Sequence, residues 1–236
     1  MHTQIGTIIS LNIPQVGAQL PFLGFDFLLI DLEHGSVSDE TINALVLAKP
    51  AGFKILIRLE EITEKCIKHA LDIGADGIIA PRVESLAEVQ MMIDYAYYPP
   101  VGKRSVGFTL ANNYGINQQY TTAFKPLILP QVESVKGVEI AADIIALDKV
   151  DGIFAGPYDL SMSLGVPGQF DTGVFIRAYE TVRSACKKEN KLFATFAVNT
   201  EAALLEVKKG ADMIVTGIDA NLFLHMYAGI IKQVKQ

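Results

Sequence analysis

Short apolar runs rich in β-branched residues alternate along the chain with longer stretches in which apolar residues recur at helical spacing. This alternation is typical of repeated strand–helix units, in which parallel strands form the centre and helices cover them. Eight such runs occur, and eight is the number of strands that closes a parallel barrel. The pattern predicts an α/β fold of the (β/α)₈ TIM-barrel type. The predicted strands are residues 5–11, 25–32, 54–59, 77–83, 126–132, 152–157, 192–198 and 213–218.

A weak internal repeat supports the barrel. The segments "PFLGFDFLLI" (21–30), "LDIGADGII" (71–79) and "VKKGADMIV" (207–215) share a helix end, a glycine, a small or aromatic residue, an Asp and a strand. Glycine suits the position after a helix end because φ is often positive there. Each copy is therefore predicted to be the turn that leads from a helix into the next strand. Helices are predicted at 38–50 and 85–97, with Ser38 and Ser85 as N-caps.

Residues 97–125 form a gap too long for a simple helix, and they contain prolines, glycines, asparagines and aromatic residues. An insertion of this kind in a compact domain is usually a functional or interface loop. We expect it to be a loop at the rim of the barrel that helps to select the substrate. The whole chain, 1–236, is predicted to be one domain, since barrels of about 250 residues fold as single domains.

The composition is rich in hydrophobic residues and poor in the charged residues that cover a small monomer. Half of the residues are hydrophobic, mean hydropathy is +0.30 and only 19% of residues are charged. We expect the excess to be buried in the interface of a homo-oligomer. The net charge of −6 and the pI near 5.2 argue against a nucleic-acid partner, so small molecules are the expected ligands.

The two cysteines, Cys66 and Cys186, lie far apart in helical stretches, which indicates neither a disulfide framework nor a zinc site. The first residues show no cationic segment followed by a long apolar one, and no apolar run approaches the roughly 18 residues of a membrane span. The sequence therefore predicts a cytoplasmic protein with no membrane association.

Polar residues gather at the ends of the predicted strands. In a (β/α)₈ barrel the active site lies at the carboxyl ends of the strands, so these residues are candidates for function. The residues at the strand ends, most of which are polar, are Asp31, Glu33, His34, Arg58, Pro81, Arg82, Gln131, Glu133, Gly156, Pro157, Asp159, Thr216 and Gly217.

Glu133 and Asp159 are the candidate metal ligands. Alone, each is more often a carboxylate at a helix N-terminus. On adjacent strands of one barrel mouth, however, two carboxylates form an oxygen site suited to Mg²⁺ or Mn²⁺. A Schiff-base mechanism is disfavoured, because Lys54 and Lys125 lie at strand starts and the other lysines fall on helices or in the long loop.

His34 is the candidate general base, because Asp31 lies three residues earlier and a carboxylate on one imidazole nitrogen raises the basicity of the other. Arg58 is suited to stabilise a developing oxyanion, although it could instead pair with Glu60 or Glu61. The other histidines, at 2, 69 and 225, are interpreted as structural.

Five segments of the chain match a known family. They are "GFDFLLIDLEHG", "LDIGADGIIAPRVES", "YYPPVGKRSVG", "LPQVES" and "GIFAGPYDLSMSLG". Together they resemble the HpcH/HpaI aldolase/citrate lyase family, in which class II aldolases cleave 2-oxo-4-hydroxy acids to pyruvate and an aldehyde. The resemblance covers nearly the whole chain. It is most specific in the last two segments, whose acidic residues are 26 positions apart.

The resemblance implies roles for individual residues. Glu133 and Asp159 match the metal ligands, with Mg²⁺ or Mn²⁺ expected and Co²⁺ as a further candidate. His34 with Asp31 matches the base dyad, and Arg58 matches the arginine that contacts the substrate oxo group. The family usually has "DGEHA" where this chain has "DLEHG", and a proline where this chain has leucine after the arginine.

The resemblance also implies a site shared between subunits. Asp72 matches an acidic residue that family members bring toward the dyad of a neighbouring subunit. Residues Gly156, Pro157, Tyr158 and Asp159 match the turn whose amides hold the pyruvate carboxylate, and Gln131 is expected at the same mouth. Members exchange their last helix between subunits and commonly form hexamers, a trimer of dimers.

The expected reaction is a metal-dependent retro-aldol cleavage of a 2-keto-3-deoxy sugar acid or a hydroxy-oxo-dicarboxylate. Two alternatives stay open from the sequence. One is an acyl-CoA lyase of the citryl or malyl type, although such relatives usually lack the histidine at the end of the second strand and are longer. The other is a catalytically silent barrel that serves as a binding protein, because fold does not imply function.

Overall fold

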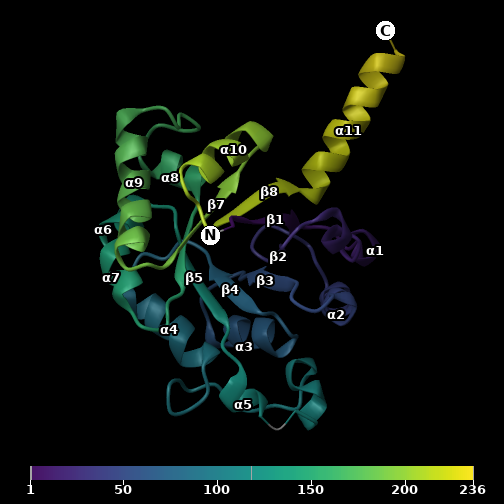
Figure 1. Cartoon of the computed structure of the whole chain (residues 1–236), viewed down its shortest axis with the longest axis vertical. Coiled ribbons are helices and arrows are strands. Elements are labelled where there is room, and N and C mark those ends of the chain that lie inside the picture. Colours follow the sequence, from purple (N-terminus) through teal and green to yellow (C-terminus); the bar gives the residue numbers. More distant parts are fainter. Residues whose placement is uncertain (1, 118, 236) are drawn as a thin grey trace.

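The chain folds into a closed barrel of parallel strands in which each strand pairs with the next and β8 returns to pair with β1 (Figure 1). This computed structural model describes residues 2–117 and 119–235. It confirms the predicted (β/α)₈ architecture. The strands are β1 (Gln4–Ile9), β2 (Phe27–Asp31), β3 (Lys54–Arg58), β4 (Gly77–Ala80), β5 (Leu127–Val132), β6 (Gly152–Ala155), β7 (Leu192–Ala197) and β8 (Met213–Ile218).

Helices surround the barrel and begin largely where the sequence indicates. Ser38 and Ser85 cap their helices as predicted, and Ser85 forms a reciprocal capping box with Glu88. The helices are α1 (Pro14–Gly17), α2 (Asp39–Ala48), α3 (Glu64–Asp72), α4 (Leu86–Ala96), α5 (Tyr120–Ala123), α6 (Val135–Glu139), α7 (Ala141–Ala146), α8 (Pro157–Ser163), α9 (Gly173–Lys188), α10 (Thr200–Lys208) and α11 (Asp219–Val234), with 3₁₀ turns η1 (Leu20–Leu23) and η2 (Leu110–Gly115).

Six strands end one to three residues earlier than predicted, and for two of them the difference has a local cause. β4 ends at Ala80 and β6 at Ala155, whereas the apolar pattern extends to 83 and 157. Arg82 has φ of 46°, which no strand residue adopts, and Pro157 begins α8. These early ends leave irregular backbone at the barrel mouth.

The repeated glycine–aspartate turns close the opposite end of the barrel. Gly24, Gly74 and Gly210 have positive φ, as the repeat predicts. The Asp of each copy accepts a hydrogen bond at 2.7–2.9 Å from a backbone amide of the strand beside it. The same turn recurs because, in each copy, a backbone amide at the start of the neighbouring strand needs a hydrogen-bond acceptor.

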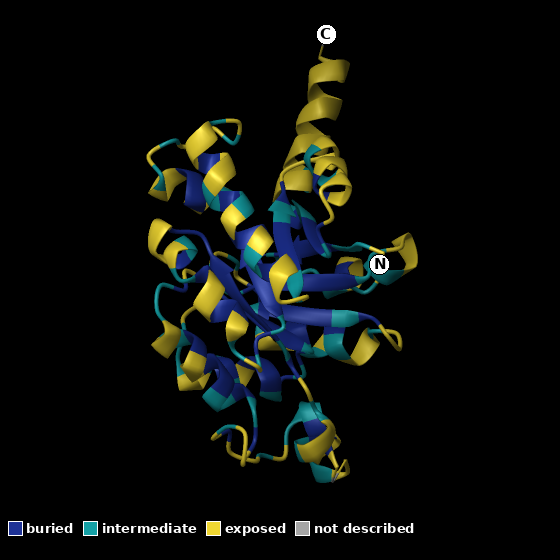
Figure 2. Ribbon diagram, turned by 60° about the vertical axis from the view of Figure 1, so that its left-hand side comes forward, coloured by how far each residue is buried: buried dark blue, intermediate teal, exposed yellow. Residues whose placement is uncertain are grey.

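The core consists of two apolar layers, which Figure 2 shows in dark blue. On β2, Phe27 and Leu29 belong to the cluster that fills the barrel, whereas Leu28 and Ile30 belong to the cluster between strands and helices. This alternation follows from the pleat of a strand, whose successive side chains point to opposite faces. It decides which residues at the strand ends face the mouth.

The 97–125 insertion does not lie at the mouth, so the expectation of a rim loop is wrong in position. The insertion joins the end of α4 to the start of β5, which places it at the amino ends of the strands. Its Arg104 is fully buried and donates to Asp72 at the end of α3 at 2.6 Å. Within its own subunit the insertion therefore cannot shape the substrate cavity.

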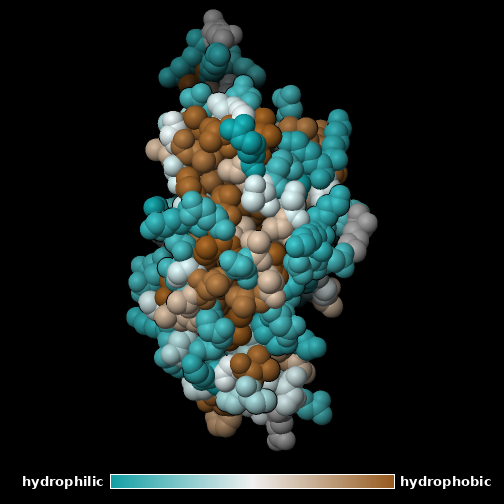
Figure 3. Space-filling model, turned by 90° about the vertical axis from the view of Figure 1, so that its left-hand side faces the viewer, coloured by the Kyte–Doolittle hydropathy of each residue, from teal (hydrophilic) through white to brown (hydrophobic). Residues whose placement is uncertain are grey.

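α11 begins at the buried Asp219, extends away from the barrel and is exposed over most of its length (Figures 1 and 2). Apolar atoms also lie among polar ones on the side of the barrel that carries α9 (Figure 3). Within the described residues, no helix combines the length and apolar character of a membrane span. The exposed apolar side chains of α11 are Leu222, Leu224, Met226, Tyr227, Ile230, Ile231 and Val234.

Candidate active site at the carboxyl ends of the strands

The apolar side chains that fill the barrel end one inward-facing residue before the mouth. The residues that follow in the inward-facing rows of β2, β3 and β5 are Asp31, Arg58 and Gln131. Because side chains alternate along a strand, these polar groups point into the barrel above its apolar filling. The strand pattern itself thus builds the floor of the site.

Asp31 and Arg58 form a two-pronged ion pair on neighbouring strands. The Arg58 Nε donates to one Asp31 oxygen at 2.9 Å, and Nη2 donates to the other at 2.7 Å. Burial raises the pKa of Asp31, but the hydrogen bonds and positive charge of Arg58 outweigh it and leave that pKa below its usual value. Asp31 is therefore ionised and holds the guanidinium in a fixed plane.

Glu33 adds a second carboxylate to Arg58, with Oε2 at 3.3 Å from Nε. Burial raises the pKa of Glu33, and the charges of Asp31 and Asp159 act in the same direction. The sequence placed Glu33 at the strand end but gave it no role. The position of Glu33 between Asp31 and His34 could have indicated a role for it. Only the fold shows that Glu33 also contacts Arg58.

His34 lies at the mouth, but not in the predicted contact. Its backbone amide donates to Asp31 at 3.3 Å, whereas its imidazole Nε2 lies 3.7 Å from Glu33. The expected hydrogen bond from the imidazole to Asp31 is thus not formed, because the Arg58 fork occupies both Asp31 oxygens. The imidazole is 70% exposed and faces the open side of the site.

Glu133 turns into the site rather than capping a helix. Ser134 caps α6, while Glu133 Oε1 accepts from the Arg82 amide at 2.8 Å and Oε2 accepts from the Gln131 side chain. The left-handed backbone of Arg82 aims its amide at this carboxylate. Burial raises the pKa of Glu133, helped by the charge of Asp159. A buried carboxylate beside another acidic group is a position that a cation would stabilise.

Gly156 brings the start of α8 close to Glu133. A Cβ at this position would lie 2.6 Å from Glu133 Oε2 and 2.9 Å from its Cβ, so only glycine allows the approach. Asp159 stands in the first turn of α8 and is exposed to the mouth.

A cavity of about 170 Å³ joins these groups. It is lined by most of the residues predicted from the sequence, together with apolar side chains of the strand ends. The predicted residues at its wall are His34, Arg58, Gln131, Glu133, Gly156, Pro157, Tyr158 and Asp159.

The donor set fits a hard divalent cation that keeps open positions. In residues 2–117 and 119–235, no group of three or more His, Cys, Asp or Glu side chains is placed to hold a metal. Mg²⁺, however, is commonly held by one or two carboxylates, with waters and substrate oxygens completing its shell. Glu133 and Asp159 match that arrangement, and the buried Gln131 Oε1 beside them has no hydrogen-bond partner among the described residues.

Asp72 is not brought to the site of its own subunit. It lies at the end of α3, which is the end of the barrel opposite the mouth, and it pairs with Arg104. The alternative interpretation of Arg58 as a partner of Glu60 or Glu61 is wrong, since Arg58 pairs with Asp31 and Glu33.

Comparison with known proteins shows the family to which the chain belongs. A family model described as HpcH/HpaI aldolase/citrate lyase matches residues 4–226. The chain belongs to this family. Its resemblance to the family is therefore confirmed, and with it the prediction of a carbon–carbon lyase.

Individual relatives match almost the full length of the chain. A 2-keto-3-deoxy-L-rhamnonate aldolase of Salmonella gallinarum is 31% identical over 94% of this chain and 85% of its own. The structure of an HpcH/HpaI aldolase/citrate lyase family protein from Burkholderia cenocepacia has a TM-score of 0.92 at 26% identity, covering 100% of this chain and 95% of that chain. An HpcH/HpaI aldolase from Desulfitobacterium hafniense has a TM-score of 0.86 at 29% identity, covering 99% and 93%.

Proposed function

We propose that this lyase is a divalent-metal-dependent aldolase that cleaves a 2-oxo-4-hydroxy acid to pyruvate and an aldehyde. The substrate is of the 2-keto-3-deoxy sugar acid or hydroxy-oxo-dicarboxylate type, in keeping with the relative from Salmonella. The observation that carries the proposal is one cavity in which two carboxylates, a fixed guanidinium and an exposed imidazole meet. These are the groups that a retro-aldol cleavage needs.

Glu133 and Asp159 would hold the metal, Mg²⁺ or Mn²⁺, with Co²⁺ as a further candidate. When bound, the ion supplies Lewis-acid polarisation of the 2-oxo group. The backbone amide of Arg82 and the side chain of Gln131 fix the Glu133 carboxylate for this task.

Arg58 binds the 2-oxo oxygen and stabilises the negative charge that develops there. Its plane is set by Asp31 before substrate arrives, so little reorganisation is needed during the reaction. The start of α8, from Gly156 to Asp159, lies at the same wall and orients the pyruvate carboxylate.

His34 accepts the proton of the 4-hydroxyl, directly or through a water. The C4–O bond then becomes a carbonyl, the C3–C4 bond breaks, and its electron pair passes into the enolate of pyruvate. The proton taken up by His34, directly or through a water, then adds at C3 of the enolate, which gives pyruvate and restores the imidazole as a base. The exposure of the imidazole lets it reach the aldehyde half of the substrate.

The site is completed in a homo-oligomer. Asp72 pairs with Arg104 at the end of the barrel opposite the mouth. In the oligomer it would reach the mouth of a neighbouring subunit and orient His34 there, in place of Asp31. The projecting α11, with its exposed apolar side chains, is exchanged between subunits, and the assembly is a hexamer built as a trimer of dimers. A cytoplasmic location stays a prediction from composition.

Pyruvate release from a panel of 2-oxo-4-hydroxy acids tests the proposal. Release is followed by coupled reduction of pyruvate, before and after EDTA and with Mg²⁺ or Mn²⁺ restored. We expect release to disappear with EDTA and to return with metal. An Asp159→Asn variant is expected to need far more metal for the same rate.

Other outcomes would redirect the assignment. Release that persists in EDTA contradicts the metal-dependent mechanism. No release from any acid, with metal binding demonstrated, would favour an acyl-CoA lyase or a silent binding protein.

A further inference from the structure

The wall of the reaction cavity has no positive charge to spare. Among the described residues, Arg58 is the one lysine or arginine that lines this cavity, and Asp31 and Glu33 already contact its guanidinium. Glu133 and Asp159, at the same wall, are acidic. A divalent ion between these two carboxylates would be matched by them in charge. A second carboxylate on the substrate would therefore find no unpaired cation at this wall.

Two further cations belong to the loops of the mouth but do not line the cavity. Arg82 follows β4 and Lys136 lies in α6, and they pair with the Glu84 carboxylate at 3.4 and 3.5 Å. Both side chains are mostly exposed, and neither belongs to the cavity wall. A distal carboxylate inside the cavity would instead meet acidic side chains, and close like charges are unfavourable.

Tyr158 provides a neutral polar contact at the same wall. It lines the reaction cavity and is 43% exposed. Ser161 donates to the Tyr158 carbonyl at 2.6 Å, whereas no described residue bonds to the Tyr158 hydroxyl. A tyrosine hydroxyl can both donate and accept a hydrogen bond, so this group suits a neutral hydroxyl of a ligand.

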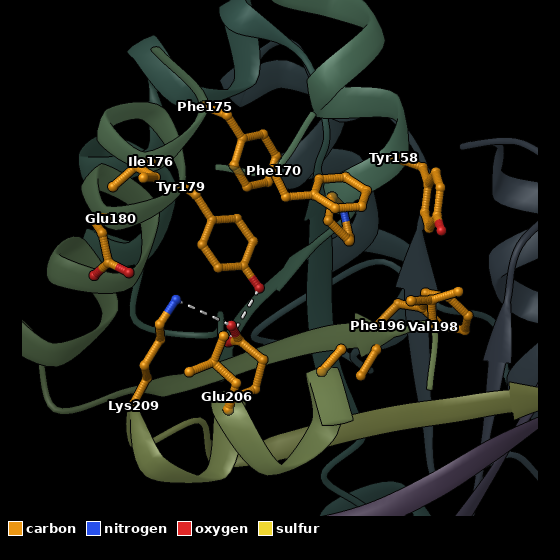
Figure 4. Close-up of a pocket in the computed structure, with 14 residues that line it drawn as sticks. Tyr158, Phe170, Phe175, Ile176, Tyr179, Glu180, Phe196, Val198, Glu206 and Lys209 are labelled. Carbon is orange, nitrogen blue, oxygen red and sulfur yellow. Dashed lines mark hydrogen bonds and ion pairs between the residues drawn. The ribbon is translucent and has the colours of Figure 1, made fainter. Parts of the chain in front are cut away.

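Aromatic neighbours restrain the position of the Tyr158 ring. The ring packs edge-on against Phe170, with centroids 5.0 Å apart, and its centroid lies 6.5 Å from that of Phe196. Figure 4 shows Tyr158 and Phe196 at the end of a neighbouring apolar cavity that lies away from Glu180 and Lys209. A restrained side chain loses little conformational entropy when it binds a ligand, which favours a role in recognition.

We propose that Tyr158 determines substrate specificity by hydrogen bonding to a hydroxyl of the aldehyde half, and that this half is a neutral polyol without a second carboxylate. The chain then prefers a 2-keto-3-deoxy sugar acid to a hydroxy-oxo-dicarboxylate. The proposal rests on the proposed aldolase function and narrows its substrate class. The backbone of Gly156 to Asp159 orients the pyruvate half, while the Tyr158 side chain contacts the aldehyde half.

Tyr158→Phe gives the sharpest test, because it removes the hydroxyl and keeps the ring. Tyr95→Phe is the matched control, since Tyr95 lies in α4, is partly exposed and does not line the cavity. The two substrates are a 2-keto-3-deoxyhexonate and 4-hydroxy-2-oxohexanedioate, each supplied with both configurations at C4. Both contain six carbons and differ in the group that follows C4. Pyruvate release is measured at saturating Mg²⁺.

We expect the wild type to cleave the sugar acid with the higher kcat/KM. Tyr158→Phe should lower that value by about three- to tenfold, as for the loss of one hydrogen bond. The value for the dicarboxylate should stay within twofold, and Tyr95→Phe should change neither. Wild-type preference for the dicarboxylate, equal losses for both acids in Tyr158→Phe, or no loss for the sugar acid would overturn the proposal.

A binding measurement separates this proposal from the aldolase assignment. 5,6-Dihydroxy-2-oxohexanoate and 2-oxohexanedioate lack the 4-hydroxyl and cannot undergo retro-aldol cleavage, so calorimetry can compare their affinities at saturating Mg²⁺. Tighter binding of the dihydroxy compound to the wild type, weakened in Tyr158→Phe and kept in Tyr95→Phe, supports the proposal even where no acid is cleaved. Equal affinity of the two compounds, or tighter binding of the dicarboxylate, refutes it whatever the turnover.

Discussion

Two arginines, Arg58 and Arg183, each form an ion pair with a largely buried carboxylate, but the two pairs have different roles. The side chain of Arg58 is 15% exposed and that of Arg183 is 10% exposed, and each donates to a buried carboxylate. Arg58 stands at the mouth with Asp31, and Arg183 lies between α9 and α10 with Glu206. Burial alone therefore does not distinguish the functional arginine from the structural one.

The surroundings distinguish them. Arg183 lies over the rings of Phe193 and Tyr179, with its guanidinium carbon 4.2 and 5.4 Å from their centroids. Arg58 instead meets a second carboxylate, Glu33, and borders an open cavity. At the mouth, acidic side chains outnumber the arginine, which is typical of a site that binds a cation or a proton-donating ligand. The charge of Arg183 is balanced by Glu206 and enclosed by aromatic rings, which is typical of a structural ion pair.

The largest effect that we expect falls on the enclosed pair. Arg183→Met leaves Glu206 buried without its main partner, which should lower the free energy of unfolding by about 3–5 kcal/mol. Urea unfolding followed by circular dichroism measures this. Pyruvate release per folded molecule should stay within twofold for the sugar-acid substrate.

A double variant sharpens that test. Arg183→Met with Glu206→Gln removes both charges and should recover most of the lost stability, because a neutral pair has little desolvation cost. If the double variant does not recover stability, the loss in Arg183→Met comes mainly from lost packing against Phe193 and not from the unpaired charge of Glu206.

Arg58→Lys should lower activity strongly and leave stability almost unchanged, the opposite of Arg183→Met. Lysine keeps a positive charge beside Asp31 but cannot form the fork, so stability should change by about 1 kcal/mol or less. Loss of the fixed donor should lower kcat by about 10²–10³-fold. Steady-state pyruvate release at saturating Mn²⁺ measures it, and near-normal kcat would remove Arg58 from the reaction.

The sequence predicted the barrel because short apolar β-rich runs recur between helical stretches, and because the glycine–aspartate turn recurs in three of the units. It also predicted which residues reach the mouth, since that follows from strand ends. It could not assign partners across strands. The Asp31–Arg58 fork depends on the register that sets these two residues side by side, which the sequence does not state.

The position of the 97–125 insertion was predicted wrongly for a related reason. Composition identified it as an unusual loop, but only its order in the chain, after a helix and before β5, places it at the amino ends of the strands. Asp72 follows the same logic, because a helix that precedes a strand ends away from the mouth. Counting helix ends as well as strand ends would have placed the insertion correctly, whereas the glycine–aspartate repeat had already placed Asp72 at a helix end.

Gly156→Ala tests how closely the mouth is packed around Glu133. The new Cβ would lie 2.6 Å from Glu133 Oε2, so the carboxylate must move. We expect metal affinity to fall by about 10–100-fold, as for loss of a group that positions a ligand. Mn²⁺ titration followed by electron paramagnetic resonance measures it. Gly229→Ala on α11, where a Cβ meets nothing within 4 Å, is the control and should leave the affinity unchanged.

The smallest effect concerns stability in acid, which depends on the Asp31–Arg58 pair. The pKa of Asp31 is lowered in the fold, so its stabilising contribution is full above the ordinary value of 3.8 and is lost as pH falls through the lower folded value. Asp31→Asn removes this contribution, and each tenfold change in proton affinity corresponds to about 1.4 kcal/mol. Urea midpoints between pH 2 and 6 should show the wild type and the variant converging toward low pH. A constant difference across this range would mean that Asp31 titrates alike in the folded and unfolded chain, and that Arg58 does not hold it.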